Sequence, residues 1–123
     1  MVAASMARGE VYLAWRDRRE IGTVTVSSSD PMIWPDRSAD AAYVHRLAIR
    51  RVFGGLGYGR AILEWAEGSA QSAGKKRVRL DCVADNAGLR HYYEQAGYAY
   101  AGDAERAGFR LSRYEKPLFG GMT

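Results

Sequence analysis

The sequence predicts a domain of the α/β (α+β) class, built on one mixed sheet. Segments in which apolar and polar residues alternate, as they do in strands, occur before, between and after two segments with helical spacing of apolar residues. Their order is β-β-β-α-β-α-β-β, which combines antiparallel hairpins with helical crossovers between parallel strands. One domain is expected over residues 1–123, without repeats or linkers.

The first two strands are expected at Glu10–Trp15 and Ile21–Ser27, where alternation is clear and a charged segment supplies a turn. Residues 1–9 are expected to form a flexible N-terminus. The segment 28–40 contains two prolines and is expected to be a loop. Trp34 lies in this loop, and two roles stay open for it: a hydrophobic anchor or part of the wall of a substrate pocket.

The third strand is expected at Ala41–Arg50, and alternation assigns its residues to two faces. One face is predicted to carry Tyr43, His45, Leu47 and Ile49. The first helix then begins within residues 57–60 and ends at Gly74, where basic residues follow near its negative end. Its predicted apolar face consists of Ile62, Trp65, Ala66, Ser69 and Ala73.

The rest of the chain is predicted to complete the sheet. The expected elements are, in order, a strand at Val78–Val83, a helix at Ala87–Ala96, and strands at Tyr98–Ala101 and Phe109–Leu118. Asp85 or Asn86 can cap the second helix. Gly102 and Gly108 are expected in the loop that joins the last two strands.

Composition limits the function classes. The net charge is +4 and the isoelectric point is near 9.4, which favours an anionic partner. Nucleic acid is not the expected partner, because the basic residues do not form a long stripe interleaved with aromatic residues. No apolar run reaches the roughly 18 residues of a membrane span, and no secretory signal is evident, so a cytoplasmic protein with no membrane association is expected. The lone Cys82 excludes a cysteine-based zinc site, and no metal site is predicted.

A glycine-dense loop separates the third strand from the first helix, with glycine at 54, 55, 57 and 59. It lets a ligand approach the backbone closely, and the helix directs unpaired N–H groups at an anion. The P-loop does not match, because Arg60 stands where lysine is required. The dinucleotide fingerprint matches only in part: Arg60 replaces its third glycine, although Asp81 lies where a ribose-binding acid is expected. A different phosphate-containing cofactor fits better.

Four segments in sequence order resemble the GNAT superfamily of acyl-CoA-dependent N-acetyltransferases: HRLAIRR, GGLGYGRAILEWA, RLDCVADN and YYEQAGY. The resemblance covers residues 43–98. It implies a mostly antiparallel central sheet flanked by helices, with acetyl-CoA (CoA) as the cofactor and a small-molecule or peptide amine as the acceptor. The implied reaction is direct transfer of the acetyl group from acetyl-CoA to a primary amine.

The resemblance also assigns cofactor contacts. The glycine loop would bind the pyrophosphate through backbone amides of residues 54–60, and the preceding strand would pair with the pantetheine arm where the sheet opens. The residues assigned in this way are Leu47, Ala48, Ile49, Gly54, Gly55, Leu56, Gly57, Tyr58, Gly59, Arg60, Asn86 and Tyr93. Gly54 stands where the family usually has Arg or Gln, so a side-chain phosphate contact is absent at that position.

Two residues are candidates for proton transfer. Tyr93, seven residues after Asn86, matches the family tyrosine that protonates the departing thiolate, a role that suits a phenol with a pKa of about 10. Its alternative role is packing beside Tyr92. His45 lies on the strand where family members often hold a Glu or a water relay, and it is a candidate general base. Its alternative role is that of a hydrogen-bonded structural residue.

Family members usually carry a strand and two helices before the first hairpin, and these elements cover the acceptor site. This chain has at most nine residues there. Three explanations stay open: a truncated reading frame, a minimal version of the fold, or a second subunit, as in a homodimer, that covers the site. The alternative function is therefore a non-catalytic acyl-CoA-binding module or subunit without a complete acceptor site. The sequence identifies neither the acceptor amine nor the acyl-chain preference.

Overall fold

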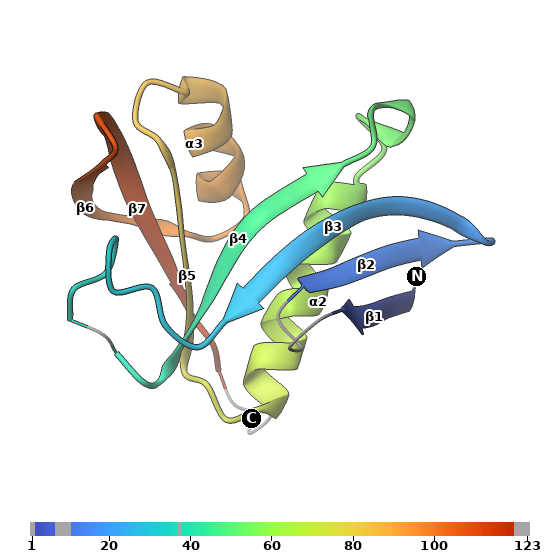
Figure 1. The fold of residues 1–123 in the computed structure, drawn as a ribbon, viewed down its shortest axis with the longest axis horizontal. Coiled ribbons are helices and arrows are strands. Elements are labelled where there is room, and N and C mark those ends of the chain that lie inside the picture. Colours follow the sequence, from blue (N-terminus) through green and yellow to red (C-terminus); the bar gives the residue numbers. More distant parts are fainter. Residues whose placement is uncertain (1, 7–10, 37, 120–123) are drawn as a thin grey trace.

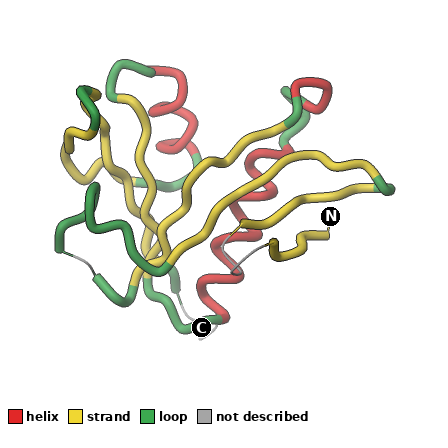
Figure 2. Tube along the Cα trace, in the orientation of Figure 1, coloured by secondary structure: helices red, strands yellow, loops and turns green. Residues whose placement is uncertain are grey.

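The computed structural model describes residues 2–6, 11–36 and 38–119, which form one seven-stranded sheet in the order β1-β2-β3-β4-β5-β7-β6 (Figure 1). The strands are β1 (Val2–Met6), β2 (Val11–Arg16), β3 (Arg19–Ser27), β4 (Ala41–Ile49), β5 (Arg77–Val83), β6 (Ala99–Arg106) and β7 (Phe109–Pro117). The helices are α2 (Tyr58–Ser72) and α3 (Ala87–Gln95), and a short 3-10 helix, η1 (Arg51–Phe53), precedes α2 (Figure 2). Only the β4–β5 pair is parallel within the described residues, so the predicted mixed, mostly antiparallel sheet is confirmed.

The N-terminal segment corrects the prediction of a flexible stretch over residues 1–9. Residues 2–6 form β1, which pairs antiparallel with β2 from Val2 opposite Trp15 to Met6 opposite Val11. β2 would otherwise expose a row of unpaired backbone groups, and β1 satisfies them. Backbone pairing does not need an alternating pattern of side chains, so the strand cannot be predicted from the sequence of this segment. Residues 7–10, where the first hairpin was predicted to begin at Glu10, lie outside the described residues.

Two-residue turns close both hairpins. The turn between β2 and β3 has φ angles of 50° at Asp17 and 68° at Arg18, and the turn between β6 and β7 has 52° at Ala107 and 83° at Gly108. Two successive positive φ angles match the right-handed twist of the paired strands. Three of these four residues are not glycine, which explains why the first turn carries no strong sequence signal.

The last hairpin is longer than predicted. β6 continues beyond Ala101 to Arg106, so Gly102 lies within the strand instead of in a loop. Gly102 has a φ of 94° and lies at an irregularity in the register between β6 and β7. A glycine at such an irregularity is typical of a β-bulge, which a sequence pattern does not distinguish from a turn.

A bulge interrupts β4 at Arg46. This residue has a φ of 52°, and the register with β3 changes there, from Thr25 opposite His45 to Thr23 opposite Ala48. Two residues of β4 therefore lie opposite one residue of β3. An extra residue exchanges the two faces of the strand for every side chain that follows it.

The bulge makes the predicted faces of this strand wrong. Tyr43 lies in a hydrophobic cluster on one face of the sheet, whereas Leu47 and Ile49 pack against the main core on the other face. They were predicted to share a face with Tyr43 and His45. A positive φ is usual for glycine and asparagine, and Arg46 is neither, so the sequence does not indicate the bulge at this position.

β4 and β5 stay together only at one end. Their parallel pairing runs from Ala41 opposite Arg77 to Tyr43 opposite Arg79, and the two strands then separate (Figure 1). The sheet therefore opens beside the C-terminal half of β4, as the family resemblance implies. The edge of β4 that faces the opening carries backbone groups without a partner strand.

The main core lies between the sheet and the two helices. α2 buries Ile62, Leu63, Ala66 and Ala70 against it, and α3 contributes Tyr93. The predicted helix face was partly wrong, because Ser69 and Ala73 are exposed while Leu63 and Ala70 are buried. α2 packs on three strands, β3, β4 and β5, so its buried stripe is set by that surface. Gly74 ends this helix in the left-handed region, as predicted, with a φ of 83°.

Arg79 ties the loop over residues 28–40 to the opposite face of the sheet. Its side chain is 6% exposed and donates hydrogen bonds to both carboxylate oxygens of Asp36 (2.8 and 3.0 Å) and to Glu115 (3.0 Å). These bonds lower the pKa of Asp36. The guanidinium also lies 4.3 Å from the centre of the buried Trp34 ring. Trp34 therefore has the anchor role.

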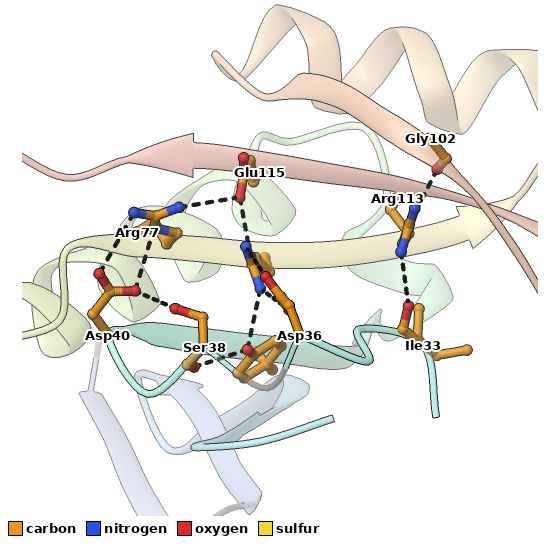
Figure 3. Close-up of polar contacts among 10 residues, drawn as sticks. Ile33, Asp36, Ser38, Asp40, Arg77, Gly102, Arg113 and Glu115 are labelled. Carbon is orange, nitrogen blue, oxygen red and sulfur yellow. Dashed lines mark hydrogen bonds and ion pairs between the residues drawn. The ribbon is translucent and has the colours of Figure 1, made fainter. Parts of the chain in front are cut away.

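Two further arginines hold the same loop (Figure 3). Arg77 pairs with Asp40 at 3.4 Å, and Arg113 donates to the backbone carbonyl oxygens of Ile33 at 3.3 Å and Gly102 at 3.4 Å. Arg77 attaches the loop to β5 at the end where β4 and β5 are still paired, and Arg113 attaches it to β7 at a position opposite Asp81, beyond that end. Within the described ranges, no helix is both long and apolar enough to cross a membrane.

Two glycine substitutions are predicted to change stability in opposite directions. A Cβ atom on Gly22 of β3 would overlap the backbone carbonyl oxygen of Ala48, which cannot move without breaking the strand pairing at the bulge. Gly22→Ala is therefore expected to lower the free energy of unfolding by about 2 kcal/mol or more. Gly68→Ala, at an open position within α2, is expected to raise it by about 0.5–1 kcal/mol.

Urea unfolding followed by circular dichroism measures both changes. The chemical change is identical in the two variants, so Gly68→Ala is a matched control. Equal effects of the two substitutions would contradict the close approach of β3 and β4 at Gly22.

Candidate active site

A pocket of about 310 Å³ lies between the end of β4, the glycine loop and α3, and we call it the loop pocket. Its lining residues are Leu47, Ile49, Phe53, Gly54, Gly55, Gly57, Tyr58, Gly59, Arg60, Leu89, Tyr92 and Tyr93. Most residues assigned to the cofactor from the sequence are among them. The exceptions are Ala48, Leu56 and Asn86.

Two of these exceptions have identifiable surroundings. Asn86 caps α3, because its Oδ1 atom accepts a hydrogen bond from the Leu89 N–H group at 3.0 Å. Leu56 is 65% exposed, at the outer side of the loop. Phe53, Leu89 and Tyr92 also lie in the wall and were not predicted from the sequence. The spacing of Leu89, Tyr92 and Tyr93 along one helix face is a signal that could have identified two of them.

The N-terminus of α2 faces the loop pocket without a side-chain cap. Its capping residue, Gly57, has a φ of 84°, and no side chain in the described part of the chain caps the first turn. The first helical hydrogen bond runs from the Ala61 N–H group to the Gly57 carbonyl oxygen at 3.1 Å, so the N–H groups before it have no partner within the helix. Together with the helix dipole, they form a site suited to an anion.

Gly54 differs from the other glycines of the loop. Its N–H group donates a hydrogen bond to the Arg51 carbonyl oxygen at 3.0 Å, at the end of η1. This bond occupies a donor that the sequence analysis had included among the amides available to a phosphate. The available amides therefore begin after Gly54.

Gly59 leaves room for the side chain of Tyr92. A Cβ atom at this position would lie 2.8 Å from the Tyr92 hydroxyl oxygen. The absence of a side chain lets α3 approach the first turn of α2, and both helices then contribute to the wall of the loop pocket.

A second pocket, of about 230 Å³, opens where β4 and β5 separate, and we call it the polar pocket. It is lined by Asp30, Ile33, Val44, His45, Arg46, Leu47, Asp81, Tyr93, Arg106 and Leu111. Leu47 and Tyr93 belong to the walls of both pockets. The two pockets therefore meet at these residues, between the bulged strand and α3.

Tyr93 is buried at this meeting point, with 7% of its surface exposed. Burial raises the pKa of its phenol to about 12. Other buried tyrosines use their hydroxyl groups within the protein: Tyr98 donates to Glu67 at 2.7 Å and Tyr114 to Glu94 at 2.8 Å. The Tyr93 hydroxyl has no such partner among the described residues, so it is available to a ligand.

His45 lies in the polar pocket together with two carboxylates. Its Nε2 atom is 3.0 Å from the Ser27 hydroxyl oxygen, and its Nδ1 atom is 3.7 Å from Asp30. Asp30, His45 and Asp81 each bring a ligand atom within 4.8 Å of the others. Burial raises the pKa of Asp81, and the neighbouring charge of Asp30 adds to this effect. The cluster is chemically able to bind an ammonium group, to accept a proton or to ligate a cation.

His45 was a candidate general base, whereas Asp81 was noted only as a partial match to a ribose-binding acid and Asp30 had no predicted role. Asp30 lies in the loop over residues 28–40, and Asp81 lies on β5, on the side away from its apolar face. These two residues are 51 positions apart in the chain. Only the folding of the loop over the opening brings them together.

Comparisons with known proteins agree with this architecture. The model of the Acetyltransferase (GNAT) family matches residues 3–98. The Bacillus subtilis (strain 168) protein "Uncharacterized N-acetyltransferase YesJ" is 34% identical over 122 residues, which cover 95% of this chain and 66% of the relative. A solved GNAT-family acetyltransferase from Listeria monocytogenes 4b F2365 is 28% identical, with a TM-score of 0.75, over 89% of this chain and 65% of that one.

A third relative shares the fold at lower identity. It is a Bacillus anthracis str. Ames protein named as a streptothricin acetyltransferase, solved in complex with acetyl coenzyme A. It is 16% identical, with a TM-score of 0.72, over 89% of this chain and 62% of that one. The chain thus spans slightly less than two thirds of the length of each of these relatives. Because the family model covers most of its residues, the chain belongs to the GNAT family of acetyltransferases.

Proposed function

We propose that this chain transfers an acetyl group from acetyl-CoA to a primary amine, by direct attack of the amine. The observation that carries the proposal is the meeting of the loop pocket and the polar pocket at Leu47 and Tyr93. A transfer between two substrates needs two binding sites that touch at the reacting atoms. The acetyl coenzyme A complex of the B. anthracis protein, which has the same fold, supports the choice of cofactor.

The residues of the loop pocket fit the chemistry of CoA. The uncapped first turn of α2 offers N–H groups and a positive dipole end to a pyrophosphate, and the dipole contributes about 0.3–1 kcal/mol. Arg60 adds a positive charge at the same end of the helix. Leu47, Ile49 and Phe53 give the pocket an apolar wall for an uncharged arm. Acetyl-CoA would supply an acetyl group activated as a thioester.

The open edge of β4 provides the second part of the cofactor site. Beyond Tyr43, its backbone groups have no partner strand on the side of β5. They are available to bind an extended arm with amide groups, in the way that a peptide adds to a sheet edge. An N–H group freed at the Arg46 bulge would also polarise the acyl carbonyl group.

We assign the two proton transfers to His45 and Tyr93. The amine nitrogen forms a bond to the acyl carbon, the carbon–sulfur bond breaks, and the amine loses a proton. His45 accepts this proton at Nδ1, where the Asp30 carboxylate, 3.7 Å away, stabilises the imidazolium. Tyr93 donates its hydroxyl proton to the leaving sulfur. With a pKa of about 12, the phenol holds that proton at neutral pH. Return of the proton from His45 to Tyr93 through solvent restores both groups.

Acetyl-CoA binding tests the cofactor site. Isothermal titration calorimetry of the full chain is expected to give a dissociation constant below 1 mM for acetyl-CoA. Arg60→Glu is expected to weaken binding roughly tenfold or more, because it places a negative charge beside the phosphate site. Lys76→Glu is the matched control: it makes the same charge change at an exposed position beyond the other end of α2. Equal effects of the two variants, or no binding, would contradict the assignment.

Tyr93→Phe tests the proposed acid. The variant keeps the buried ring and removes the hydroxyl group, so turnover is expected to fall about 100-fold with acetyl-CoA affinity unchanged. Release of the CoA thiol with a panel of primary amines measures turnover, and calorimetry measures affinity. Tyr100→Phe, at a half-exposed position outside both pockets, is the control. An unchanged rate in Tyr93→Phe removes Tyr93 from the reaction. Binding of acetyl-CoA without thiol release by the wild type would indicate a non-catalytic acyl-CoA-binding module.

A further inference from the structure

We propose that the polar pocket binds an acceptor with an anionic group beside its amine, and that this acceptor belongs to the class of free amino acids and similar small zwitterions. The inference rests on the proposed function, since it names the substrate class of the same site. It follows from the way in which opposite charges are arranged within the pocket. Of the charged residues that line it, Asp30 is buried and Asp81 is half-buried, and we call their side of the pocket the inner end; Arg46 and Arg106 are exposed, and we call their side the mouth.

The inner end is suited to the amine. The Asp30 side chain is 10% exposed, and the cationic group nearest to it among the described residues, His45 Nδ1, is 3.7 Å away, which is too long for a hydrogen bond. Ser27 engages the other ring nitrogen of His45 at 3.0 Å and so orients the ring. Asp81 completes a set of acceptor atoms within 4.8 Å of one another. A buried carboxylate without a hydrogen-bonded partner is costly, and an ammonium group would remove that cost.

The mouth of the pocket is suited to an anion. Arg46, at the β4 bulge, and Arg106, at the end of β6, both line the pocket and are both exposed. Neither forms an ion pair with another residue in the described ranges, whereas the ion-paired arginines there are Arg16, Arg60, Arg77, Arg79 and Arg110. Guanidinium groups bind carboxylates through two parallel hydrogen bonds, so two of them at one entrance favour an acceptor that carries a carboxylate.

Size and charge distinguish this class from other amines. A pocket of about 230 Å³ is smaller than those that hold drug-sized molecules, for which about 300–1,000 Å³ is usual. A polyamine would place its second positive charge near the two arginines, which would repel it. The amine at the start of a peptide has an uncharged amide where a free amino acid has its carboxylate. A free amino acid presents one charge to each end of the pocket.

Binding experiments on the full chain, without acetyl-CoA, test this inference. Each common amino acid is compared with two probes that share its amine: the corresponding amide, and the amine in which hydrogen replaces the carboxylate. Saturation-transfer NMR titrations give the dissociation constants. For the amino acids that bind, the acid is expected to bind at least about tenfold more tightly than either probe.

Variants identify the groups responsible. Arg46→Gln and Arg106→Gln are each expected to weaken binding of the acid about tenfold, and to leave the affinity for the two probes without a carboxylate within about twofold. Arg16→Gln, on a residue that lines neither pocket, is the matched control and is expected to change nothing. Asp30→Asn is expected to weaken the binding of the acid and of both probes equally. Circular dichroism establishes that each variant is folded.

The outcomes separate this inference from the proposed function. Three outcomes would overturn the inference. They are equal affinity for the acid and its amide, an affinity for the acid that neither arginine variant changes, and no binding of any amino acid at concentrations of about 10 mM. If thiol release occurs with amines that lack a carboxylate and not with amino acids, the proposed function holds and the inference falls. If amino acids bind in an arginine-dependent way and acetyl-CoA does not bind, the inference holds and the proposed function falls.

Discussion

The separation of β4 from β5 is the constraint on which the site depends. Parallel pairing ends at Tyr43 and Arg79, and from there the backbone edge of β4 faces an opening instead of a neighbouring strand. The bulge at Arg46 then exchanges the two faces of β4, so that Leu47 reaches the helix side and lines both pockets. Continuous pairing with β5 would occupy the backbone groups that the proposed cofactor needs. Tyr93 on α3 lies across this opening.

Strands that separate in this way need other contacts to fix their positions on each side of the opening. At the paired end, Arg79 joins β5 to the loop through Asp36 and to β7 through Glu115, in a largely buried position. Losing such a group would leave charged partners unsatisfied, which makes this end a firm attachment. At the open end, α2 and α3 both line the loop pocket, where Gly59 leaves room for the Tyr92 hydroxyl group. The sheet can therefore part locally while the rest of the core stays packed.

Much of the fold and part of the site could be predicted from residue patterns. Alternation located β2 to β5 and β7, and Asn86 and Gly74 marked helix ends that the structure confirms. Nearly all of the glycine loop lines the predicted pocket. The failures within the sheet share one cause. The bulge at Arg46, the irregularity at Gly102 and the pairing of β1 are decided by register with a neighbouring strand, and a pattern read along one strand contains no information about its neighbour.

The sequence by itself determined which residues can serve as phosphate-binding backbone, as proton donor and as strand or helix, because these properties belong to residue types and short spacings. The tertiary structure decided which groups meet. Asp30, His45 and Asp81 come from a loop and two strands, and Arg46 and Arg106 come from a bulge and the end of a hairpin, yet all of them line one pocket. Their proximity depends on long-range packing of the loop over the separated strands. Electrostatic recognition acts over a few ångströms in space, and distances of that kind between remote residues are set only when the chain has folded.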